Sequence, residues 1–147
     1  MFRTMILLTL MATSGHLLAA DNPFVGTWTS NFSKSKLPKD FPFKSVQLQF
    51  AVVFDTVTIG SMFVNASGKQ ETAADLFHTD GKEHPGTLNP GVIHQARWID
   101  SRTLETSAKK DGKDVGVVTY EVSADGKTLT SKYSISPGQV LVYERRE

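Results

Sequence analysis

Three histidines beyond the N-terminal segment, His78, His84 and His94, are the side chains best suited to acid–base or metal chemistry. His78 and His84 lie on either side of Asp80, so two imidazoles and a carboxylate could approach one metal ion around a turn. A metal site needs ligand spacing that imposes a geometry, as in His-Glu-x-x-His, and this stretch has none. We therefore interpret these residues as solvated loop histidines beside surface charges, and we predict no metal site.

The sequence also lacks the motifs of nucleophilic and phosphate chemistry. It contains no Gly-x-Ser-x-Gly elbow and no glycine-rich phosphate loop. No set of acid, base and nucleophile can be placed, although composition alone never excludes a Ser-His-Asp arrangement. We predict a protein that is not an enzyme, with no catalytic residue and no cofactor; the three histidines are the best remaining candidates for catalysis.

A stronger pattern is the alternation of apolar and polar residues, which places every second side chain on one face of a strand. Eight large side chains on such faces are the candidate ligand-binding residues of the interior: Leu48, Phe50, Ile59, Phe63, Phe77, Trp98, Tyr120 and Tyr133. A pocket of this composition suits an apolar or aromatic small molecule. The alternative is a packed core without a cavity, because large aromatic side chains can fill a small barrel.

The elements that must position these residues are expected to be strands joined by short turns. The strands are expected at residues 24–31, 44–54, 57–63, 70–79, 92–100, 103–110, 115–123, 128–136 and 139–146. Asp111-Gly112 and Asp125-Gly126 stand between alternating runs, which is the strongest short-range signal for a hairpin. The segment from Glu71 to Asp75 would also fit a short helical turn, so the fourth strand is the least defined.

About nine strands in sequential hairpins form an antiparallel meander. A meander of eight or more strands protects its edges best by closing on itself. The expected fold class is therefore all-β, an up-and-down barrel. A β-sandwich is the second choice, since it would need longer crossover connections than most of these turns allow.

The segment from Phe32 to Phe43 interrupts this regularity. Its two prolines and several lysines are unsuited to a strand or helix, so we expect a long connection. Phe41 and Phe43 within it are expected to fold over an open end of the core. They could form a lid over a binding site, but simple packing is the favoured interpretation.

Residues 1–20 have the pattern of a secretory signal peptide. Arg3 precedes an apolar run from Met5 to Met11, and Leu18-Ala19-Ala20 offers a small-residue cleavage site. The apolar run is too short for a membrane span, which needs about 20 apolar residues. We expect a secreted protein, periplasmic or extracellular, cleaved after Ala20, with residues 21–147 forming one barrel domain.

The composition of residues 21–147 excludes several partners. Because Arg3 is the only charged residue of the leader, 15 Lys and Arg remain against 15 Asp and Glu, so the formal charge is zero. Scattered charges of this kind are unlike the basic surface of a nucleic-acid binder. The chain has no cysteine, so without disulfides the apolar residues must make one continuous core.

Several short motifs resemble those of calycin barrels. Gly26-Thr27-Trp28 is similar to the Gly-x-Trp that opens lipocalins. Further stretches resemble small secreted lipocalin-like proteins of bacteria: Asn31-x-x-Lys34-Ser35-Lys36, Asp80-Gly81-Lys82, Val122-Ser-Ala-Asp-Gly-Lys-Thr-Leu-Thr130 and Val142-Tyr-Glu-Arg145. The Thr-Asp-Tyr motif and the usual disulfide of lipocalins are missing, which favours membership of the broader calycin superfamily.

The resemblance implies a barrel of eight to ten strands with one closed end. It also implies that an arginine of the last strand packs across Trp28, a structural role for which Arg145 is the first candidate and Arg146 the alternative. Gly26, on the same face as Trp28, would leave room for the indole to lie against the backbone.

The predicted function is that of a secreted or periplasmic lipocalin-like barrel that binds a small hydrophobic ligand without catalysis. The alternative is a filled barrel that acts as a protein-interaction or assembly module. That alternative predicts an exposed apolar patch at one rim, around Phe41 and Phe43. The sequence identifies no protein partner.

Overall fold

The computed structural model describes residues 22–147. The predicted signal peptide, residues 1–20, lies outside the described residues and stays a prediction. No helix among residues 22–147 is long and apolar enough to cross a membrane.

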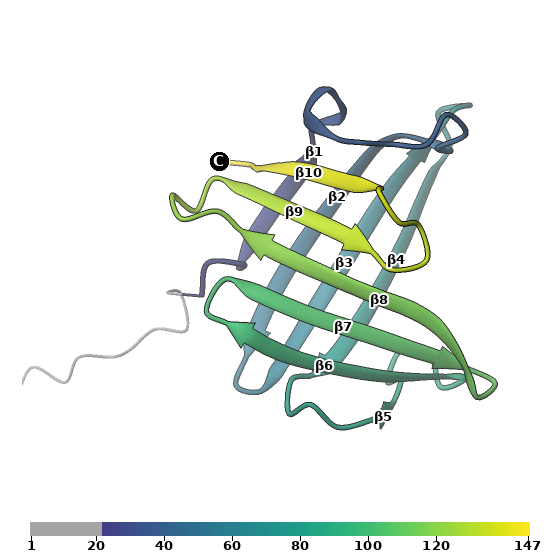
Figure 1. Ribbon diagram of the computed structural model, residues 1–147, viewed down its shortest axis with the longest axis vertical. Coiled ribbons are helices and arrows are strands. Elements are labelled where there is room, and N and C mark those ends of the chain that lie inside the picture. The colour runs from purple at the N-terminus through teal and green to yellow at the C-terminus, as the bar shows by residue number, and fades with distance from the viewer. Residues whose placement is uncertain (1–21) are drawn as a thin grey trace, which may run out of the picture.

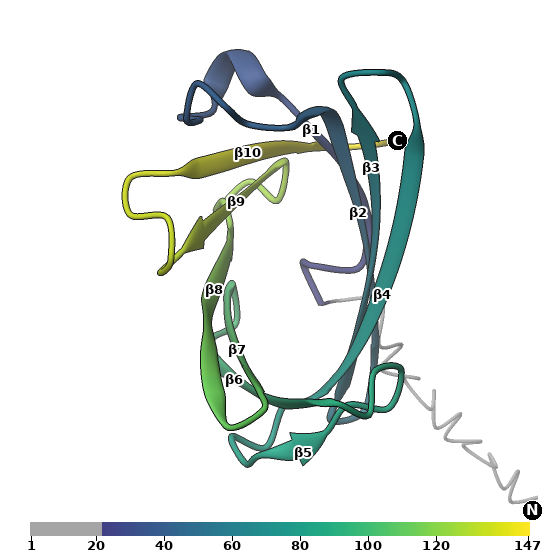
Figure 2. The same ribbon diagram turned by 90° about the vertical axis from the view of Figure 1, so that its right-hand side faces the viewer.

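Ten antiparallel strands form one sheet that curls into a nearly closed barrel, which confirms the all-β meander (Figures 1 and 2). The strands are β1 (Gly26–Ser30), β2 (Phe43–Val53), β3 (Thr56–Asn65), β4 (Gln70–His78), β5 (His84–Pro85), β6 (Val92–Asp100), β7 (Thr103–Lys110), β8 (Lys113–Val122), β9 (Thr128–Tyr133) and β10 (Val140–Arg145). β1 pairs with both β2 and β10, so the first and last strands lie side by side in the sheet. Figure 2 shows β1–β4 facing β6–β10 across the interior.

The barrel closes between β4 and β6 without a regular ladder. Asp80 and Arg97 form an isolated bridge there, and the Gly81 amide donates to the Ala96 carbonyl at 2.9 Å. The two-residue β5 lies in what we expected to be an irregular loop, residues 82–90. So short a strand carries no alternation of its own, and it exists only because it pairs with β6.

The hairpin turns follow the sequence signals. Asp111 and Gly112 both have positive φ, 53° and 74°, as a two-residue turn matched to twisted strands requires. The segment that also fitted a helical turn is part of β4, because its backbone pairs with β3 along its whole length. At the β2–β3 turn, which we placed at Asp55, the preceding Phe54 has φ 53° and is 96% exposed.

One end of the barrel is closed by Phe24, Trp28 and Arg145. Both aromatic side chains are fully buried, and the Trp28 indole donates to the Phe24 carbonyl at 2.9 Å. The Arg145 guanidinium lies 4.2 Å from the centre of the indole ring. Arg146, by contrast, is exposed and reaches only Gln47, at 3.3 Å.

Gly26 makes room for a different group from the one we expected. A Cβ at this position would lie 2.9 Å from Nη1 of Arg145, and the glycine has φ +129°. The space beside Trp28 therefore accommodates the guanidinium on the indole face rather than the indole on the backbone.

The connection from β1 to β2 packs its aromatic side chains against one another. It contains a short 3₁₀ helix, Phe32–Lys34, and it ends before Phe43, which we expected within it but which is the first residue of β2; Phe41 and Phe43 are both half-buried. Ring centroids separated by 5.5, 5.7 and 4.8 Å link Phe32, Phe41, Phe43 and Phe63 in a row. We call these four residues the aromatic row. All four side chains are partly buried and pack against the hydrophobic core.

Candidate functional site

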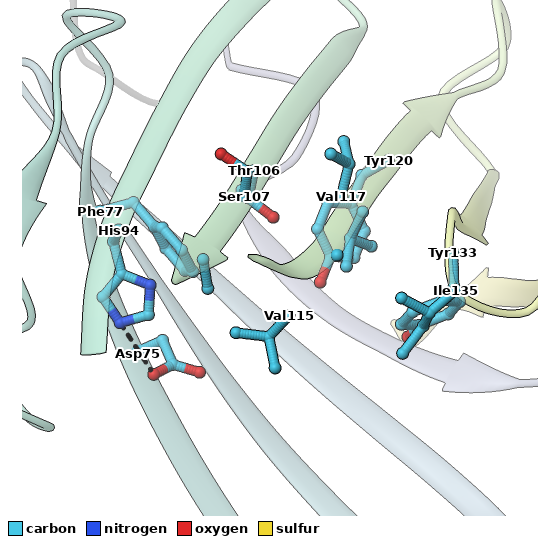
Figure 3. Close-up of a pocket in the computed structure, with 13 residues that line it drawn as sticks. Asp75, Phe77, His94, Thr106, Ser107, Val115, Val117, Tyr120, Tyr133 and Ile135 are labelled. Atoms are coloured by element: carbon cyan, nitrogen blue, oxygen red, sulfur yellow. Dashed lines mark ion pairs between the residues drawn. The ribbon is translucent and has the colours of Figure 1, made fainter. Parts of the chain in front are cut away.

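A cavity of about 180 Å³ lies between strands β4, β6, β7, β8 and β9 (Figure 3). Its lining comprises Asp75, Phe77, His94, Thr106, Ser107, Ala108, Val115, Gly116, Val117, Val118, Tyr120, Tyr133 and Ile135. Phe77, His94, Thr106 and Tyr120 are among the buried residues, whereas Val115 is 46% and Ile135 69% exposed. The latter two therefore mark the mouth of the cavity.

The apolar wall is built by period-two alternation on neighbouring strands. Phe77 on β4, Val118 and Tyr120 on β8, and Tyr133 on β9 all face inward, and Val118 stands opposite Tyr133 in the ladder. Pairing of Ala108 with Gly116 places two small residues opposite each other on β7 and β8. A Cβ at Gly116 would lie 2.9 Å from Cγ2 of Ile135, so the glycine gives room to Ile135 at the mouth, whereas the short Ala108 side chain leaves space between the aromatic residues.

The polar wall is formed by Asp75 and His94. The His94 Nε2 atom lies 3.6 Å from a carboxylate oxygen of Asp75, and the His94 side chain is only 8% exposed while that of Asp75 is 44% exposed. The ring of Phe77 packs edge-on against the imidazole, with centroids 4.7 Å apart. The buried Nδ1 atom of His94 has no hydrogen-bond partner among residues 22–147.

Tyr120 contributes a neutral hydroxyl to this environment. Burial, reinforced by the neighbouring Tyr133 and the Asp75 carboxylate, raises the pKa of Tyr120 far above its usual value. Burial also raises the pKa of Tyr143, on the adjacent part of the interior, well above 10. Both phenols therefore keep their protons throughout the physiological range and can donate as well as accept hydrogen bonds.

Three of the eight candidate ligand-binding residues line the cavity: Phe77, Tyr120 and Tyr133. Leu48, Phe50 and Ile59 lie in the packed core, each less than 5% exposed. Phe63 belongs to the aromatic row, and Trp98 packs against Phe24 near the closed end, with centroids 5.2 Å apart. Among residues 22–147, the interior is therefore packed on the β1–β3 side, and the cavity lies beside β7 and β8.

Sequence reasoning missed the polar wall. Asp75 lies two residues before Phe77 on the same face of β4, so a charged residue pointing inward was detectable from alternation once that segment was read as a strand. His94 and Thr106 likewise share faces with buried Ala96 and Leu104. What alternation could not show is that Asp75 and His94, on strands separated by β5, lie beside each other.

The other two histidines lie near one another outside the cavity. Their rings are 4.4 Å apart, and Nε2 of His84 lies 2.9 Å from both carboxylate oxygens of Asp80. Hydrogen bonds from the Lys82 amide and from His84 lower the pKa of Asp80. Among residues 22–147, no group of three or more His, Cys, Asp or Glu side chains is arranged to hold a metal ion.

No protein-family model matches the sequence, and no curated protein is detectably similar to it. Solved structures do match the fold. The wild-type fluorescent protein UnaG aligns with a TM-score of 0.54 at 18% identity, over 84% of this chain and 97% of that one. A Schistosoma mansoni fatty-acid-binding protein in complex with arachidonic acid aligns with a TM-score of 0.56 at 12% identity, over 85% of this chain and 97% of that one.

An Echinococcus granulosus fatty-acid-binding protein aligns similarly, with a TM-score of 0.53 at 14% identity, over 85% of this chain and 98% of that one. At such identities the similarity concerns the fold alone. The chain thus has an all-β barrel fold of ten antiparallel strands that is similar to the folds of these fatty-acid-binding proteins and of UnaG.

Proposed function

We propose that this protein is a non-catalytic carrier or sensor that binds one small hydrophobic molecule inside its barrel. The observation that carries the proposal is the cavity bounded by Phe77, Tyr120 and Tyr133, which opens beside Val115 and Ile135. Concave, mostly apolar spaces with a few polar groups are the usual form of small-molecule sites. The barrel fold shared with fatty-acid-binding proteins supports the same proposal.

The size of the cavity limits the ligand. Its volume is about 180 Å³, and an apolar cavity of roughly 150 Å³ is enough to hold a benzene molecule. The part of the ligand that is enclosed is therefore about one aromatic ring with a short substituent. A longer chain would have to extend through the mouth between Val115 and Ile135.

The lining groups support binding rather than catalysis. Asp75 and His94 resemble two members of a catalytic triad, but their closest atoms are 3.6 Å apart. A base must also reach a nucleophile, and the remaining nitrogen of His94 has no hydrogen-bond partner among residues 22–147. We therefore assign these groups to ligand recognition.

The test is a titration of the isotopically labelled protein with 2-phenylethanol, followed by NMR chemical shifts. Amide signals of β7 and β8 should shift in a saturable manner. In Ala108→Leu, a larger side chain fills part of the cavity, so affinity should fall by about tenfold or more, the equivalent of roughly 1.4 kcal/mol.

Ala124→Leu is the matched control, because Ala124 is exposed in the β8–β9 turn, away from the cavity lining. It should bind 2-phenylethanol as the parent does. Equal binding by the parent and Ala108→Leu, or saturable shifts confined to other strands, would contradict the proposed site.

We further propose that the protein is secreted, with residues 1–20 removed as a signal peptide. The support is the charge, apolar run and small-residue site of the N-terminal sequence. Intact mass measurement of the protein isolated from its native host tests this directly. A mass corresponding to a chain that begins at Met1 would contradict it.

A further inference from the structure

The cavity contains a negative charge and no fixed positive charge to balance it. Among its thirteen lining residues, Asp75 is the only carboxylate, His94 the only imidazole, and none is Lys or Arg. The side chain of Asp75 is 44% exposed, so its oxygens remain accessible beside the apolar wall. A ligand that enters this space meets the carboxylate without a neighbouring guanidinium or ammonium group.

Arg145, at the end of β10, is held by other hydrogen bonds. Its Nε donates to the Gly126 carbonyl at 2.9 Å, its Nη1 to the Val25 carbonyl at 2.7 Å, and its Nη2 to the Pro23 carbonyl. Held in this way on the face of Trp28, it cannot turn toward Asp75 without losing all three hydrogen bonds. The nearby Lys109, on β7, is paired with Glu83 outside the cavity.

The polar wall offers a ligand a hydrogen-bond acceptor. An ionised carboxylate only accepts hydrogen bonds. In Figure 3 the nitrogen of His94 that is not joined to Asp75 faces the side where Val115 and Thr106 lie. This nitrogen is buried and lacks a partner among the described residues, so the 44% exposed carboxylate of Asp75 is the acceptor of the polar wall that a ligand can reach.

We propose that the cavity selects a small aromatic or aliphatic amine, whose ammonium group donates to Asp75 while its apolar part lies against Phe77, Tyr120 and Tyr133. This inference rests on the proposed function and specifies its ligand class. The faces of the two tyrosines add attraction for a cation. A carboxylate ligand, such as the arachidonic acid bound by the Schistosoma mansoni protein, would instead bring a second negative charge to Asp75.

The test compares three probes that share one aromatic ring and differ in the polar end: 2-phenylethylamine, 2-phenylethanol and phenylacetate. Each is titrated into the protein comprising residues 21–147 at pH 7 and low salt, with the NMR chemical shifts of β7 and β8 amides as the readout. The amine should bind about tenfold more tightly than phenylacetate, and the alcohol should lie between them.

The Asp75→Asn variant removes the charge but keeps the shape of the side chain. Affinity for the amine should then fall by about tenfold, affinity for phenylacetate should rise, and affinity for the alcohol should stay within about twofold. Asp111→Asn is the matched control, since it makes the same change of net charge in the exposed β7–β8 turn, where asparagine suits the positive φ. It should leave the order of the three probes unchanged.

The outcomes separate the two proposals. If the alcohol binds but phenylacetate binds as tightly as the amine, the amine inference is wrong while the binding site stands. If the amine preference survives in Asp75→Asn, surface charge rather than Asp75 is its source, and the inference is again wrong. Failure of all three probes to bind would remove the proposed function and this inference together.

Discussion

Replacing Arg145 by alanine should be among the most destabilising single substitutions in this barrel, although the residue lies far from the cavity. Arg145 joins the beginning of the chain, through the carbonyls of Pro23 and Val25, to the β8–β9 turn, through that of Gly126. Its guanidinium also covers the fully buried Trp28. Loss of the side chain therefore removes a link among three segments that meet only in the folded protein.

The magnitude follows from the contacts. A hydrogen bond donated by a charged group contributes roughly 1.5–3 kcal/mol, and a partly desolvated cation–π contact contributes about 1–2 kcal/mol. These values are not additive, since water can reach the half-buried carbonyls once the guanidinium is gone. We expect a loss of about 3–4 kcal/mol, out of the total of roughly 5–15 kcal/mol that is typical of a domain.

Urea unfolding followed by the fluorescence of Trp28 and Trp98 measures the loss. Arg146→Ala is the natural control, because it changes the same residue type at the neighbouring position, where the exposed side chain donates one hydrogen bond, to Gln47 at 3.3 Å, and the backbone bond to Thr27 is kept. It should cost less than about 0.5 kcal/mol. Equal unfolding free energies for the two variants would refute the assignment of Arg145 as the residue that fastens the Trp28 end of the barrel.

Two further predictions concern ionisation and backbone strain. The buried Tyr120 has a raised pKa in the folded state, so it binds its proton more tightly than in the unfolded chain. The protonated phenol therefore contributes fully to the free energy of unfolding below the pKa of the unfolded chain, near 10, and this contribution falls by up to about 1.4 kcal/mol per pH unit above it. Urea midpoints measured from pH 8 to 11 should fall less steeply in Tyr120→Phe than in the parent. An unchanged slope would contradict the burial of this phenol. Phe54 has φ 53° and is almost fully exposed, so Phe54→Asn should stabilise the protein by about 0.5–1 kcal/mol, and a lower melting temperature in calorimetry would show that the ring makes an unrecognised contact.

The strand order and the position of the core were predictable because both follow from local rules. Alternation along β2, β7 and β8 identifies the inward face of each strand, and the Asp-Gly turns join each strand to its neighbour. A meander assembled from such hairpins has one natural partner left for β1, which is β10. The role of Arg145 beside Trp28 also came from the sequence, through the resemblance to calycins.

The site depended on features that no local rule contains. Leu48 and Tyr120 have the same alternation, yet Leu48 lies in the filled half of the barrel while Tyr120 borders the cavity. Whether an inward side chain meets another side chain or open space depends on the sizes of its neighbours across the barrel. The short side chain of Ala108 leaves space, Gly116 gives room to Ile135 at the mouth, and the two residues become neighbours only through the pairing of β7 with β8.

The charge of the cavity also depends on tertiary contacts. Asp75 and His94 lie on strands that share no ladder, and only closure of the barrel between β4 and β6 brings them to 3.6 Å. In sequence each is one polar residue among many, and the sequence gives no sign that three backbone carbonyls hold Arg145 away from the cavity. Alternation along the chain thus determines which side chains enter the barrel, whereas closure and packing determine which of them a ligand would meet, because contacts across the interior join residues distant in sequence.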